Sequence, residues 1–169
     1  SIAITAAKGL YFINFTGSDP NKPTQIWTQG ETEANSCWFP TIDSPNQKTS
    51  QEIYITVPNK FKTLSNGVLV SQENSGSNRT DYWKFDQKHA PYLFFMGVGE
   101  YEVIEDSYKN IPVNYYVEKK YASVAKDIFG QTPEMIGFFE DRLGVAYPWA
   151  KYSQIVAREY VSGAMENTT

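Results

Sequence analysis

The chain has few of the residues that build metal or nucleophilic centres. Its 169 residues include one cysteine, Cys37, and one histidine, His89. One cysteine excludes an internal disulfide and a cysteine-based zinc cage. One histidine excludes a two-histidine zinc motif. We expect His89 to lie at the surface, in a turn flanked by lysine and proline, and Cys37 to be a small buried residue rather than a nucleophile.

Basic residues are fewer than acidic ones, and long apolar runs are scarce. The formal net charge is −4, so no basic face is expected to neutralise phosphates, and nucleic acid is a poor candidate partner. The longest strongly apolar stretch, residues 91–98, is far too short to cross a bilayer, and we expect no membrane segment in this chain. A peptide or small-molecule ligand fits this composition better.

What the chain does have is apolar and aromatic content. Hydrophobic residues make up 41% of it and aromatic residues 15%, which predicts one good core, or one complete domain and part of another. Ser1 leads directly into strand-like sequence without a methionine. We therefore expect the chain to be a fragment of a longer protein.

Short strands are predicted from Gly9 to about Val117. β-branched and aromatic residues are concentrated in six segments, several with period-two alternation, and Gly, Asn and Pro separate them. This pattern predicts part of an antiparallel β-sandwich. The six segments are residues 9–15, 52–58, 67–76, 80–87, 92–106 and 111–119.

The periodicity changes near Glu118. Residues 118–130 have apolar side chains at helical spacing, and a second helix is predicted after them, with Thr132 as N-cap and Gly144 just past its end. Residues 154–167 return to extended character. The fold class expected is mainly β with α: residues 1–118 as part of an N-terminal β-sandwich domain, and residues 119–169 as the beginning of a second domain.

The sequence Gly-Ala-Met-Glu-Asn at residues 163–167, called here the GAMEN segment, suggests a ligand. Gly163 and Ala164 are small, so another backbone could approach closely and pair with an extended segment as an added strand. The Glu166 carboxylate would then stand beside the end of a bound peptide and could receive its α-ammonium. The alternative is that Glu166 is a solvated strand residue.

The GAMEN segment resembles the Gly-x-Met-Glu-Asn signature of the zinc aminopeptidases related to aminopeptidase N and leukotriene hydrolase. In that family the N-terminal sandwich also contributes Gln-x-Glu, followed by Phe-Pro and an acidic residue. This chain has the same residue types in the same order, at Gln29, Glu31, Phe39, Pro40 and Asp43. Many members carry an arginine between the glutamate and Phe-Pro, whereas this chain has none there. The resemblance spans nearly the whole chain.

The resemblance implies a role for each matching residue. Glu166 would bind the substrate's α-amino group, and Glu31 would close on the same ammonium from the sandwich domain. Gln29 would face the same pocket. The remaining residues of the signature would form a strand lining the substrate backbone: Gly163, Ala164, Met165 and Asn167.

For the parent protein, the resemblance implies a zinc-dependent aminopeptidase that acts on peptides with a free N-terminus. The second domain would be the start of a thermolysin-like α+β catalytic domain. The zinc ligands, in a His-Glu-x-x-His motif, would lie beyond Thr169, so the fragment would bind no zinc and would be inactive by itself. Two rival readings stay open: a non-catalytic β-sandwich binding or scaffolding module related to the family, and a carbohydrate-binding module built on Trp27, Trp38 and Trp83.

Overall fold

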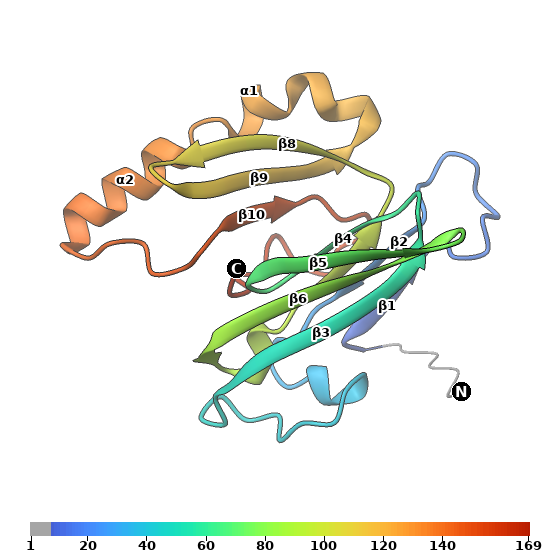
Figure 1. Cartoon of the computed structure of the whole chain (residues 1–169), viewed down its shortest axis with the longest axis horizontal. Coiled ribbons are helices and arrows are strands. Elements are labelled where there is room, and N and C mark those ends of the chain that lie inside the picture. Colours follow the sequence, from blue (N-terminus) through green and yellow to red (C-terminus); the bar gives the residue numbers. More distant parts are fainter. Residues whose placement is uncertain (1–7) are drawn as a thin grey trace. The chain divides into compact units, whose positions relative to one another are not determined.

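The computed structural model describes residues 8–169 and divides them into two compact units (Figure 1). The first contains the chain up to Glu100 together with Ala157–Thr168, which we call the C-terminal segment. The second contains Tyr101–Val156 and Thr169. The expected boundary at residue 118 falls inside the second unit, and the domain assignment stays a prediction. No helix in the described part of the chain is long and apolar enough to span a bilayer.

The first unit contains two antiparallel sheets (Figure 1). One has the strand order β1-β2-β7-β4, formed by Leu10–Ile13, Gln25–Thr28, Met96–Gly99 and Lys62–Ser65. The other has the order β3-β6-β5, formed by Thr49–Pro58, Asn78–His89 and Val68–Ser75. Two short 3₁₀ helices, η1 (Asn35–Cys37) and η2 (Pro91–Leu93), connect strands. The predicted antiparallel β-rich fold is confirmed.

Polar side chains join these two sheets across their buried faces. Thr63 Oγ1 on β4 donates to Asp81 Oδ2 on β6 at 2.6 Å, and Trp83 Nε1 donates to Thr63 Oγ1 at 3.0 Å. Along β6 buried residues alternate with more exposed ones, as expected for a strand with one face in a core. The two sheets therefore face each other as a sandwich.

The second unit is a three-stranded sheet with helices. Strand β9 (Ile111–Glu118) pairs antiparallel with β8 (Tyr101–Tyr108) and parallel with β10 (Tyr152–Ile155). In Figure 1 the helices lie along one side of this sheet. They are η3 (Lys119–Val124), α1 (Ala125–Phe129) and α2 (Thr132–Leu143). Their core contains Val113, Tyr115 and Ile136, packed with Ile104, Tyr108, Phe129, Tyr147 and Tyr152.

Several sequence predictions need local correction. The helix expected at 118–130 is a 3₁₀ turn followed by the short α1. Thr132 is not the N-cap of α2: its hydroxyl donates to the Phe129 carbonyl at 2.7 Å, and Gln131 takes the cap position without a side-chain hydrogen bond. Gly144 ends α2 at φ 69°, as predicted, because glycine adopts this left-handed conformation without a steric penalty.

The GAMEN segment is not a strand, contrary to the prediction. The extended region predicted after α2 forms a strand only at β10 and then leaves the sheet, so residues 163–167 make no ladder hydrogen bonds. Extended sequence becomes a β-strand only when a neighbouring strand offers its free backbone groups. No such neighbour meets this segment among the described residues.

The predictions for His89 and Cys37 are also wrong. His89 is buried, with its ring stacked on Phe94 at 4.4 Å between centroids and set edge-on to Phe85 at 4.6 Å. Burial lowers the pKa of His89 to about 4. Cys37 is exposed. The residues that flank His89 in the sequence do not indicate that its ring packs between Phe85 and Phe94 at the end of β6.

Candidate functional site

Three side chains from β2 and the residue after it fasten the C-terminal segment. Gln25, Trp27 and Gln29 alternate along the chain, so they point to one side of the strand, and all are buried. Gln25 Oε1 accepts from the Arg158 backbone N–H at 2.8 Å, and Trp27 Nε1 donates to the Arg158 carbonyl at 3.1 Å. The Tyr160 hydroxyl donates to Gln29 Oε1 at 2.8 Å. These bonds hold the C-terminal segment beside Gln29.

Tyr160 is the point where the candidate residues meet. Its ring contacts Trp27 at 4.8 Å between centroids, and Tyr11 stacks on Trp27 at 4.2 Å. Burial, and then the negative charges of Glu166 and Glu31, raise the pKa of Tyr160 to about 12. Both carboxylates are therefore close enough to act on the same phenol, although they are separated widely in sequence.

The other predicted residues lie around this point with differing exposure. Gln29 is buried, whereas Glu31 and Glu166 are exposed and free to meet a ligand from solvent. Asn167 is half-buried, and its buried Oδ1 has no hydrogen-bond partner among the described residues. Of the remaining predicted residues, Gly163 and Ala164 are exposed and Met165 is half-buried.

The turn that carries Glu31, residues 30–35, is called here the Glu31 turn. The Ala34 N–H donates to the Gly30 carbonyl at 2.9 Å, and the peptide bond after Glu31 is cis. A Cβ at Gly30 would lie 2.2 Å from the Tyr92 carbonyl oxygen and 2.5 Å from Asn35 Nδ2. Position 30 therefore has no room for a side chain, and Glu31 stands directly after this packed residue.

Asn35 ties the Glu31 turn to the body of the unit. Its Nδ2 donates to the carbonyls of Pro91 at 2.6 Å and Phe94 at 3.1 Å, and its Oδ1 accepts from Trp38 Nε1 at 2.7 Å. Asp43, the acidic residue of the family pattern, accepts from the Ser36 backbone N–H at 2.9 Å. Asn35 thus steadies the loop between Glu31 and Phe39.

The far end of the C-terminal segment is fastened separately. Asn66 Nδ2 donates to the Thr168 carbonyl, and Asn66 Oδ1 accepts from the Phe95 backbone N–H at 2.7 Å. Lys22 pairs with Glu159 at the near end. The GAMEN segment therefore lies between two attachment points, at Tyr160 and Thr168.

Tyr160, Trp27 and Asn35 are site residues that the sequence reasoning did not assign. Trp27 alternates with the buried Gln25 and Gln29, and since two of these three side chains are polar, no hydrophobic period marks β2 as a strand. Nothing in the sequence pairs Tyr160 with Gln29, since the two are 131 residues apart. Asn35 could be recognised only from its buried contacts.

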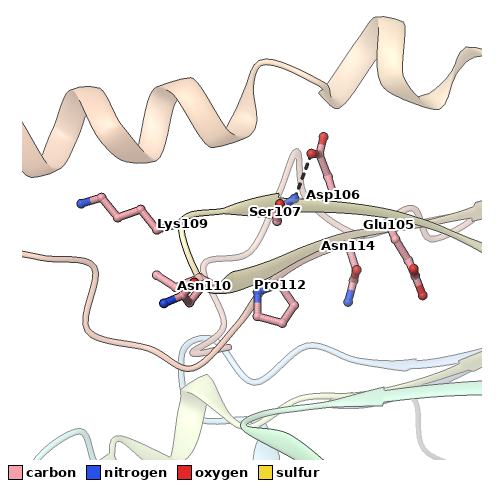
Figure 2. A pocket seen from close by; sticks show the side chains of 8 residues that line it. Glu105, Asp106, Ser107, Lys109, Asn110, Pro112 and Asn114 are labelled. Atoms are coloured by element: carbon pink, nitrogen blue, oxygen red, sulfur yellow. Dashed lines mark hydrogen bonds between the residues drawn. The ribbon is translucent and has the colours of Figure 1, made fainter.

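One surface hollow of the second unit is lined by residues other than those predicted for the site. Figure 2 shows a hollow at the β8–β9 hairpin of the second unit, lined by Glu105, Asp106, Ser107, Lys109, Asn110, Ile111, Pro112 and Asn114. None of the predicted site residues lines it. Residues 8–169 also contain no group of three or more His, Cys, Asp or Glu side chains placed to hold a metal ion. The described residues therefore do not fit a zinc site.

Comparison with known protein families shows which family the chain belongs to. Residues 3–93 match the model of the peptidase M1 N-terminal domain, which is more than half of the chain. The chain belongs to the M1 peptidase family. The M1 match covers Gln29, Glu31 and nearly all of the sandwich strands, and it ends before the second unit.

Curated M1 relatives extend the similarity toward the C-terminus. The chain is 28% identical to glutamyl aminopeptidase of Bos taurus over 94% of its length, and 29% identical to the mitochondrial aminopeptidase 2 of Saccharomyces cerevisiae over 76%. It is 27% identical to tricorn protease-interacting factor F2 of Thermoplasma volcanium over 94%. It covers 17%, 14% and 19% of these relatives, so it spans about a fifth of their length or less.

Proposed function

We propose that this chain supplies the amine-recognition part of a longer zinc-dependent aminopeptidase, which removes single residues from peptides with a free N-terminus. One observation carries the proposal. Glu31 and Glu166 come from opposite ends of the chain, and both act electrostatically on the Tyr160 hydroxyl beside Gln29. M1 membership and relatives named aminopeptidases support the same function.

Two carboxylates near one point suit a primary ammonium group. A charged amine loses its hydration on binding, and it needs anionic acceptors to offset that loss. A peptide α-amine has a pKa of about 7.7–8.0, so it is mostly cationic at neutral pH. Binding is expected to weaken as the pH rises through that range. A ligand whose N-terminus is acetylated would leave both carboxylates without a partner.

We propose that residues of the longer protein outside this chain bind the zinc ion. By the family resemblance we expect the His-Glu-x-x-His ligands beyond Thr169, and residues 8–169 offer no suitable cluster. When bound in the longer protein, zinc would supply the activated water for hydrolysis. The role of the present residues is to hold the substrate amine, and the chain by itself is expected to be inactive.

The test is Glu166→Gln in the intact protein. Glutamine keeps the shape but removes the charge, so one charge-assisted hydrogen bond to the substrate amine is lost, and kcat/KM for an alanyl p-nitroanilide should fall by roughly 10- to 100-fold. Glu159→Gln is the matched control, because Glu159 lies in the same C-terminal segment but pairs with Lys22. Its kinetics should match the wild type.

Unchanged kinetics in Glu166→Gln would contradict the role given to this carboxylate. Zinc content separates the proposal from the scaffold alternative, since only an active aminopeptidase requires about one zinc per intact chain. Failure to find zinc or aminopeptidase activity in the wild-type intact protein would favour a binding module. The carbohydrate alternative is not proposed, because Trp27 and Trp83 are 0% and 4% exposed, and the half-buried Trp38 alone does not make a stacking platform.

A further inference from the structure

The hydroxyl of Tyr160 has a defined hydrogen-bonding direction. A phenol has a single O–H donor, and this one donates to Gln29 Oε1 at 2.8 Å. Gln29 is buried with only 6% of its surface exposed, so its amide has little freedom to turn away. The phenol proton is therefore committed to Gln29, and the oxygen lone pairs of Tyr160 remain available only as acceptors.

The two carboxylates near the Tyr160 hydroxyl can accept hydrogen bonds but cannot donate them. Glu31 and Glu166 are acceptors, and their negative charges oppose ionisation of the phenol, whose pKa is raised to about 12. Tyr160 therefore stays neutral at physiological pH. A primary ammonium carries three N–H donors, and two carboxylates leave one N–H for a further acceptor.

We infer that Tyr160 positions the Gln29 amide and offers its hydroxyl oxygen as a neutral acceptor to the primary α-ammonium of a peptide. This inference rests on the proposed function, and it adds a specificity-determining residue to that site. The Tyr160 ring is held against Trp27, whose own N–H is bonded to the Arg158 carbonyl. The hydroxyl is thus placed by packing that does not involve the ligand.

Tyr160→Phe tests the inference in the intact protein, with the tripeptide Ala-Ala-Ala as the probe. Its apparent Kd is measured as the competitive inhibition constant against alanyl p-nitroanilide, from initial rates. Phenylalanine preserves the ring contact with Trp27 and removes only the hydroxyl. The Kd should rise roughly tenfold, since a hydrogen bond to a charged group is lost. Tyr11→Phe is the matched control: Tyr11 stacks on the same tryptophan, and its hydroxyl makes no hydrogen bond with the described residues. Its Kd should stay at the wild-type value.

A double-mutant cycle separates positioning from a structural role. If Tyr160 acts through Gln29, then Tyr160→Phe and Gln29→Met should cost less together than the sum of their separate losses in Ala-Ala-Ala binding. The unfolding midpoint of Tyr160→Phe without ligand should fall below that of Tyr11→Phe, because the buried Gln29 Oε1 loses its partner, so binding is compared at a temperature at which all variants remain folded. Additive losses, or equal losses in the two Tyr→Phe variants, would overturn the inference.

The outcomes also distinguish this inference from the proposed function. If the wild-type protein binds Ala-Ala-Ala and Glu166→Gln weakens that binding, the proposed function stands. An unchanged Kd in Tyr160→Phe would then overturn the role of Tyr160 only. If the wild-type protein does not bind Ala-Ala-Ala, both fall together.

Discussion

The two halves of the candidate amine site are built differently. The Glu31 turn is packed from within: Gly30 has no space for a Cβ, and Asn35 is fully buried with three hydrogen bonds. The GAMEN segment is mostly exposed, pairs with no strand and is held at Tyr160 and Thr168. A Cβ at Gly163 would meet nothing within 4 Å.

This difference separates stability from recognition. Substitutions in the Glu31 turn act on the packed sandwich, so they are expected to lower the free energy of unfolding. Substitutions in the GAMEN segment touch few atoms of the described chain and are expected to act on ligand binding. The predictions below test this division, beginning with the largest expected effect.

Asn35→Ala should be the most damaging of these changes. It removes three buried hydrogen bonds and leaves the carbonyls of Pro91 and Phe94 and the Trp38 indole N–H without this partner. The free energy of unfolding should fall by about 4 kcal/mol, as urea denaturation would measure. Asn46→Ala, at an exposed asparagine, is the control and should be nearly neutral. A loss below ~1 kcal/mol in Asn35→Ala would break the contrast between the two halves.

His89 should give the packed half a pH dependence. Its ring stacks on Phe94, whose carbonyl holds Asn35, and burial lowers the pKa of His89 from 6.5 to about 4. Between these values the unfolded chain binds a proton that the folded ring does not, so stability falls as the pH drops from about 6.5 to about 4. The shift corresponds to about 3 kcal/mol.

His89→Phe is therefore expected to reduce the loss of stability between pH 6.5 and pH 4. Both ring nitrogens of His89 are buried without partners among the described residues, so phenylalanine should also stabilise the protein at neutral pH by about 1 kcal/mol. Urea denaturation at pH 4, 5, 6 and 7 checks both effects. An identical pH slope in the wild type and the variant would show that His89 titrates normally.

Gly30→Ala and Gly163→Ala compare the two halves most directly. The new methyl group at position 30 would collide with the Tyr92 carbonyl and Asn35, so Gly30→Ala should lose about 2 kcal/mol of stability. Gly163→Ala should leave the unfolding midpoint unchanged. In the intact protein it should weaken peptide binding, because close approach of a second backbone is hindered. Equal unfolding midpoints for both variants would contradict the division.

The local sequence determined much of the sandwich. Strands such as β3, β6 and β9 have long runs of β-branched and aromatic residues. Their local sequence is therefore enough to predict them as strands. Strands β2 and β4 were missed because each is four residues long and places Gln25, Thr28, Thr63 or Ser65 in the interior. A hydrophobicity pattern cannot mark strands whose buried positions are polar.

For the candidate site, the sequence by itself determined the residue types and their order: Gln29 and Glu31 near one end, Glu166 near the other, in a family whose membership the comparisons show. Only the tertiary structure decided that the GAMEN segment is not a strand, that His89 is buried and that Tyr160 bonds Gln29. The physical reason is range. Propensity and periodicity act over neighbouring residues, whereas burial and hydrogen-bond partners depend on segments far apart in the chain that folding brings together.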